Sequence, residues 1–181
     1  MPRLILLAMF LIGITGPSVA ADNTAAPYAG QQNRAVKAYS DEEVAALLNG
    51  DGMGLAKSAE LNGYPGPAHV LALAGELKLS DRQRQQVQAI FDRMKAAAKP
   101  LGAELVERER KLDRLFASGA ITPERLSAET AAIAERQGRL RSVHLAAHLA
   151  TRALLDPGQL ALYQQLRGYH DDAAPAHHHH G

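Results

Sequence analysis

The sequence has 181 residues, of which 46% are hydrophobic, and it contains no cysteine and no tryptophan. Its formal net charge of +1 argues against nucleic acid as a partner, because binding to phosphates requires an excess of basic residues. Without cysteine no disulfide can form, so packing alone has to hold the fold together.

The first 20 residues predict a cleavable secretory signal. Arg3 supplies a small basic region, an apolar run covers 4–14, and Ser-Val-Ala at 18–20 has the small-x-small pattern of a cleavage site. The apolar run is too short to cross a bilayer, so it predicts export and not a membrane-spanning anchor. We expect the mature chain to begin at Ala21 and to reside in the periplasm.

Composition divides the rest of the chain into three parts. Residues 21–39 have few large apolar side chains and predict a disordered linker, whereas 40–169 carry helical periodicity and predict a helical domain. We expect 170–181 to be a disordered tail. The four histidines at 177–180 suit either a metal-scavenging tail or a tag remnant, and the glycine after them favours the first.

Short helices are expected before the long ones. Ser40 and Glu43 form a capping box, which predicts a helix that ends at Gly50. One or two helical turns follow at 55–61. After a stiff Tyr-Pro-Gly-Pro turn, the pattern predicts a further helix over 68–78.

The first long helix is predicted to start after Ser80 and to end at Ser118. Ser80 and Gln83 form a second capping box, and Pro100 predicts a kink because it removes a backbone hydrogen bond. Arg108 interrupts an otherwise apolar heptad pattern. The expected seam comprises Val87, Phe91, Met94, Ala98, Leu101, Leu105, Leu112 and Leu115.

The second long helix is predicted from Pro123, capped by Thr122, to about Leu155. A heptad seam indicates that one of its faces packs against another helix. The seam residues are Leu126, Ile133, Leu140, Ala147 and Leu154. Because the connection at 118–122 is short, the two long helices must form an antiparallel hairpin.

A last helix is expected from Asp156 to Arg167, with Gln159 completing a third capping box. No segment shows the alternation of a strand, so the predicted fold is all-α. It is a long kinked antiparallel hairpin with short flanking helices. The core of such a hairpin is thin, and we expect the chain to dimerise.

The stretches Leu79–Gln83 and Leu155–Gln159 resemble the paired LTxxQ motifs of the Spy/CpxP family, with Ser80 and Asp156 where threonine is usual. The resemblance extends over Pro67–Tyr169. It implies a periplasmic, all-helical, cradle-shaped dimer built on a long hairpin. The family includes ATP-independent chaperones and the metal-responsive relatives CnrX and ZraP.

Two histidines stand near the end of the second long helix. His144 lies in the seam and His148 follows at i+4, so both imidazoles can point at one metal ion. CnrX-like sensors carry two ligands at this position, with methionine in place of His148, and the resemblance implies His69 as a third ligand. Imidazoles suit Zn, Cu or Ni. Met53 is a weaker candidate for a soft ligand, and packing is the alternative role for both histidines.

The resemblance and the histidines together predict a periplasmic heavy-metal-binding, metal-responsive stress protein. One alternative is an ATP-independent chaperone that holds unfolded clients against a charged and partly apolar cradle. Another is a regulatory partner of a membrane-bound envelope-stress sensor kinase. The sequence contains no catalytic triad pattern and no nucleotide-binding loop, so we expect no enzymatic activity. We expect no membrane span in the mature chain.

Overall fold

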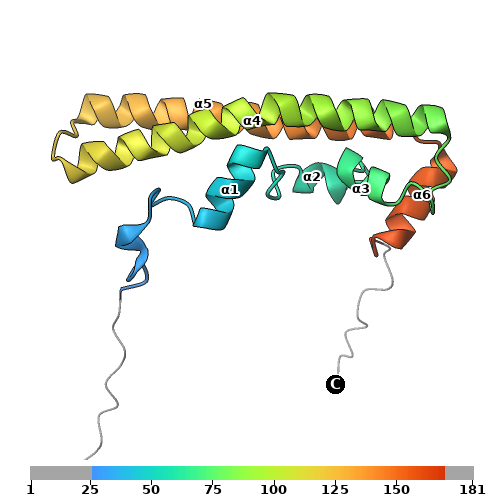
Figure 1. Cartoon of the computed structure of the whole chain (residues 1–181), viewed down its shortest axis with the longest axis horizontal. Helices are drawn as coiled ribbons and strands as arrows, with labels where there is room; N and C mark the ends of the chain where they lie inside the picture. The colour runs from blue at the N-terminus through green and yellow to red at the C-terminus, as the bar shows by residue number, and fades with distance from the viewer. Residues whose placement is uncertain (1–25, 170–181) are drawn as a thin grey trace, which may run out of the picture. The chain divides into compact units, whose positions relative to one another are not determined.

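The computed structural model describes residues 26–169, and Figure 1 shows their helices. Residues 26–30 form a turn that belongs to a separate unit, so the account below concerns residues 31–169. The expected signal at 1–20 and the tail at 170–181 lie outside the described residues. The helices are η1 (Gln31–Asn33), α1 (Asp41–Asn49), α2 (Lys57–Glu60), α3 (Pro67–Ala72), α4 (Asp81–Ala117), α5 (Pro123–Arg152) and α6 (Pro157–Leu166).

The predicted hairpin is confirmed. Helices α4 and α5 lie side by side, and α1, α2 and α3 follow one another along the hairpin (Figure 1). Their antiparallel pairing is visible in ion pairs whose residue numbers run in opposite directions, such as Glu104–Arg136 and Arg108–Glu129. Helix α4 continues through Pro100, which lies on its exposed side. The described residues contain no strand, in agreement with the expected all-α fold.

Two helix ends differ from the expected boundaries. Helix α3 stops at Ala72, and residues 73–78 turn instead of continuing it, with Lys78 in the left-handed region at a φ of 50°. Helix α5 stops at Arg152, and a turn then brings Asp156 to the start of α6. In both places the chain has to change direction so that the next capped helix can begin.

A first core cluster forms where α1 lies on the hairpin. Its buried residues are Val36, Leu47, Ala98, Leu101, Leu105, Val106, Ile133 and Leu140. Val36 belongs to the segment 21–39 that was expected to be a disordered linker, and it is only 1% exposed. The sequence did not predict this burial of Val36, and the following Tyr39 packs against the same cluster.

Helices α1 and α4 approach each other so closely that only glycine fits at the contact. A Cβ atom at Gly102 would lie 2.0 Å from the backbone oxygen of Leu47. The last turn of α1 therefore rests directly on the backbone of α4. Gly50, in the left-handed region at a φ of 68°, then ends α1 as expected.

A second core cluster closes the end of the hairpin where α4 begins and α6 follows α5. It consists of Val70, Ala74, Leu77, Leu79, Val87, Leu155 and Tyr163. Two glutamines, Gln83 and Gln159, lie beside this cluster and join the two capped helix starts. Each side-chain oxygen accepts the N–H of its own helix's N-cap, as a capping box requires.

The amide nitrogens of these two glutamines reach across to the other helix start. Gln83 Nε2 donates to the Leu154 oxygen at 2.9 Å, and Gln159 Nε2 donates to the Leu77 oxygen at 3.2 Å. The two side chains also donate to each other, at 2.8 and 3.2 Å. We call this reciprocal arrangement the glutamine interlock. Only an amide can accept at its own cap and donate across, so glutamate could not replace either residue in full.

The expected apolar seam does not extend to the tip of the hairpin. Leu126 is 40% exposed, so its place in the seam was wrong, and the nearby Phe116 is 56% exposed. Glu129 is buried there instead, and it pairs with Arg108 at 3.3 Å and with Lys111. The arginine that interrupts the heptad of α4 therefore has a partner on α5. These ion pairs, Lys111 first, hold the pKa of Glu129 below its usual range.

Replacing Glu129 with glutamine should lower the free energy of unfolding by about 2 kcal/mol at pH 7, because two charge-assisted hydrogen bonds are lost. A lowered folded-state pKa means that the ionised form stabilises the fold at neutral pH. This contribution begins to fade near the ordinary glutamate pKa of about 4.3 and is lost as the pH falls through the lowered value. Urea titrations of both proteins at several pH values measure the difference.

Glu135→Gln is the matched control, because Glu135 lies on the same helix and its ion pairs are exposed. We expect a loss below about 1 kcal/mol for this variant. Equal losses for the two variants, or a Glu129 effect that persists in acid, would contradict a stabilising buried pair.

Candidate functional site

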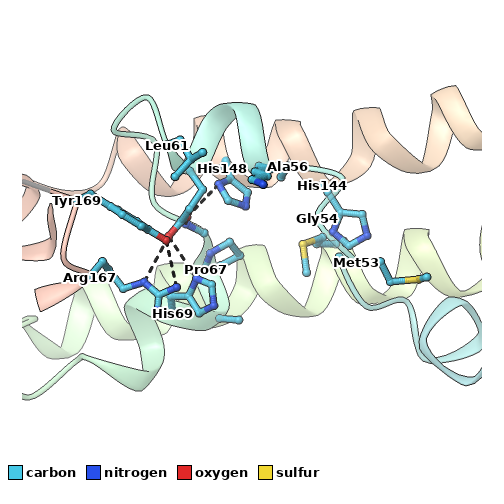
Figure 2. Close-up of a pocket in the computed structure, with 16 residues that line it drawn as sticks. Met53, Gly54, Ala56, Leu61, Pro67, His69, His144, His148, Arg167 and Tyr169 are labelled. Atoms are coloured by element: carbon cyan, nitrogen blue, oxygen red, sulfur yellow. Dashed lines mark hydrogen bonds and ion pairs between the residues drawn. The ribbon is translucent and has the colours of Figure 1, made fainter. Parts of the chain in front are cut away.

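A pocket of about 430 Å³ is lined by residues of α2, α3, α4 and α5 and of the loop before α2. Met94 lines it from α4, and His144 and His148 line it from α5. The loop before α2 contributes Met53, and α3 contributes His69. Figure 2 shows His69 at one end of the pocket, His144 at the other end beside Met53, and His148 between them. The three histidines predicted from sequence thus line one pocket.

Glu60, the last residue of α2, is the buried polar centre of this pocket. It is 7% exposed; one carboxylate oxygen accepts from the Tyr163 hydroxyl and the other accepts from the Gly66 N–H at 3.1 Å. Burial, and then the Glu60 carboxylate, raise the pKa of Tyr163 above its ordinary value. Tyr163 therefore stays protonated and serves as a donor.

Three further side chains surround the same carboxylate (Figure 2). The His69 Nδ1 lies 3.4 Å and the Arg167 Nε lies 3.6 Å from one oxygen of Glu60. The His148 Nδ1 lies 3.7 Å from the other oxygen. The carboxylate thus connects α2 with residues on α3 and α5 and with the end of α6.

His148 is held in a defined orientation. Its Nδ1 lies 2.7 Å from the Tyr64 carbonyl oxygen, which can only accept, so Nδ1 carries the proton in the neutral ring. The lone pair is then on Nε2. A Cβ at Gly66 would lie 2.8 Å from this Nε2, so a glycine is needed beside the ring. Such backbone support of the second nitrogen is typical of histidines that ligate metals.

His144 is buried and lacks a hydrogen-bond partner. It is 2% exposed, and its Nε2 is the one buried side-chain nitrogen or oxygen without a partner among residues 26–169. Burial is the main cause that lowers the pKa of His144, and the nearby His148 adds to it. The ring is therefore neutral near pH 7. An unpartnered buried nitrogen is costly, which makes this one a candidate ligand for an ion.

The structure does not bring all three histidines together. Among the described residues, no three His, Cys, Asp or Glu side chains are grouped so that they could hold a metal ion. His69 is half exposed and lies against Glu60, away from His144 in Figure 2. The prediction of His69, His144 and His148 as ligands thus remains a prediction, with His144 and His148 one helical turn apart.

Sequence reasoning did not single out Glu60, Tyr163 or Arg167. Glu60 lies in a helix of four residues, which is too short to show a periodic pattern. Tyr163 lies in the last helix, and the capping box that predicted this helix says nothing about the partners of its side chains. The separation of 103 residues between Glu60 and Tyr163 leaves no local signal that could have paired them.

A family model described as "LTXXQ motif family protein" matches residues 68–167, more than half of the chain. The chain belongs to the LTXXQ motif family. The resemblance to Spy/CpxP proteins is thereby confirmed, and the matched region includes α4, α5 and both glutamines of the interlock. No curated protein and no solved structure matches the chain. None of the helices described for this LTXXQ protein is long and apolar enough to cross a membrane.

Proposed function

We propose that this LTXXQ protein is a periplasmic, non-enzymatic stress protein that binds a transition metal ion through His144 and His148, with help from His69. The observation that carries this proposal is the buried, unpartnered Nε2 of His144, a residue that lines the same pocket as His148. Membership of a family that is typically periplasmic, together with the apparent signal sequence, supports the location. Imidazole ligands suit Zn, Cu or Ni.

An ion held by these residues would connect two parts of the fold. His144 and His148 belong to α5, whereas His69 belongs to the short helix α3. His69 would use its Nε2, because its Nδ1 faces Glu60. A metal would therefore brace α3 against the hairpin beside the Glu60 carboxylate, and this bracing would change the binding of a partner.

The test is a calorimetric titration of zinc, copper(II) and nickel into the exported protein. Serine replaces His170 and His177–180 in every sample, so that the tail cannot contribute. We expect tight binding of one ion per chain, and we expect it to be lost in the double variant His144→Ala, His148→Ala. Gln137→Ala with Arg141→Ala is the matched control, because it removes an exposed i, i+4 pair of the same helix. The proposal would be refuted if the protein with His144 and His148 intact bound none of the three ions.

A second candidate function is that of an ATP-independent chaperone. The observation that favours it is a set of large apolar side chains that remain exposed: Leu48, Leu61, Phe116, Leu126, Leu149 and Leu166. In a homodimer such residues could hold unfolded clients. Protection of a client from aggregation that survives the double histidine variant would favour this function, and it should fall when Leu149 or Phe116 becomes serine. A regulatory partner of a sensor kinase would show neither activity.

A further inference from the structure

The methionines of this chain are distributed unevenly. There are four, of which Met1 and Met9 lie in the expected signal. The other two, Met53 and Met94, come from different elements and both line the pocket of His144. Both methionines that follow the expected signal line the pocket that His144 also lines, and this suggests a use for sulfur.

Met53 is held in its place at a conformational cost. Its φ of 43° lies in the left-handed region, where a residue with a side chain is uncommon. Its side chain is 40% exposed, although methionine is among the residues most often buried. The preceding Gly52 lies against the ring of His144, since a Cβ there would be 3.6 Å from Nδ1. The loop thus brings Met53 next to His144, as Figure 2 shows.

Met94 lines the same pocket from α4. It lies on α4 between Val87 and Ala98, which belong to the two core clusters, but it lines the pocket instead of joining either cluster. Lys95 and Asp51, the charges closest to this end, pair with each other at 2.6 Å. Asp51 and Lys95 act on His144 with opposite signs, and the neutral ligand atoms that the loop and α4 bring to the pocket are the sulfurs of Met53 and Met94.

We propose that His144, Met53 and Met94 form a binding site for Cu(I). Two thioethers and one imidazole are a soft, uncharged ligand set, which selects Cu(I) over the divalent ions that prefer nitrogen and oxygen. A single positive charge also costs less to bury among neutral ligands than a double charge does. This inference deepens the metal-binding function proposed above, on which it rests, because it gives His144 two sulfur ligands that suit Cu(I).

The test compares the Cu(I) affinities of two exported proteins that both carry the tail substitutions, one of them with both methionines replaced. Each affinity is measured without oxygen, in competition with a coloured Cu(I) chelator. Mass spectrometry of the exported protein shows at which residue the signal sequence is cleaved. The variant is Met53→Leu with Met94→Leu, which keeps volume and hydrophobicity but removes both sulfurs. We expect Cu(I) binding to weaken by at least about 100-fold, since loss of a supporting residue alone costs 10- to 100-fold. We expect zinc and nickel binding to be unchanged.

A second readout uses Ag(I), which has the same charge and softness but no redox chemistry. Its addition should shift the methyl resonances of Met53 and Met94, which the single variants assign. Unchanged Cu(I) affinity in the double variant would overturn the proposal, and so would a parallel loss of zinc, nickel and Cu(I) binding, which indicates packing only. Cu(I) binding without any zinc, copper(II) or nickel binding would instead refute the divalent site and keep this one.

Discussion

Replacing Gly102 with alanine should lower the free energy of unfolding by about 3 kcal/mol, the upper end of the usual cost of overpacking. The added Cβ would lie 2.0 Å from the Leu47 oxygen, where no two such atoms can coexist. The obstacle is backbone and not a flexible side chain, so α1 has to move away from α4. Leu47 and Val36 would then lose part of their packing. Urea unfolding followed by circular dichroism measures the loss.

Gly138→Ala, in the same hairpin, should have the opposite effect on the free energy of unfolding. Gly138 lies inside α5, and a Cβ there would meet nothing within 4 Å. Alanine favours the helix over glycine by about 1 kcal/mol, so this variant should be more stable than the wild type. A gain of stability in both glycine variants would contradict the close contact between α1 and α4.

Replacing Glu60 with alanine should also cost about 3 kcal/mol, the range found when one partner of a buried ionic group is removed. The Tyr163 hydroxyl, on a side chain with no exposed surface, and the Gly66 N–H would both lose their acceptor. Unpaired buried donors retain their full desolvation cost. Arg167 and His148 would lose a neighbouring negative charge as well. Chemical denaturation at pH 7 measures the change.

Tyr163→Phe separates the hydrogen bond from the rest of this network. It removes one donor and leaves Glu60 with its other partners, so we expect a loss of about 1 kcal/mol. In a double-mutant cycle, Glu60→Ala should cost less once Tyr163 is phenylalanine, because the hydroxyl can no longer be left unpaired. Strictly additive losses would show that the two side chains do not depend on each other.

Local chemistry made much of the fold predictable. The capping boxes at Ser40, Ser80 and Asp156 all form, because each joins a side chain to a backbone N–H three residues away. The heptad pattern predicted the pairing of α4 with α5. The burial of Val36 and the early end of α3 depend on where distant helices lie, and no local pattern contains that information.

The candidate site was predictable only in part. The i, i+4 spacing singled out His144 and His148, and in the structure both line one pocket. Glu60 was missed because its partners are brought to it by tertiary structure. The same holds for the interlock, since a capping box does not reveal that the glutamine amides also reach across. Metal binding itself stays a prediction.

The glutamine interlock has a consequence for the order of folding. It joins side chains that are 76 residues apart, whereas only residues 118–122 connect α4 to α5. Closing a short connection costs little chain entropy, so contacts between Leu105 and Ile133 can form early. Once the long helices are paired, Gln83 and Gln159 need little further search to meet. We therefore expect the hairpin to assemble from its centre toward its base, with the interlock formed last and released first on unfolding.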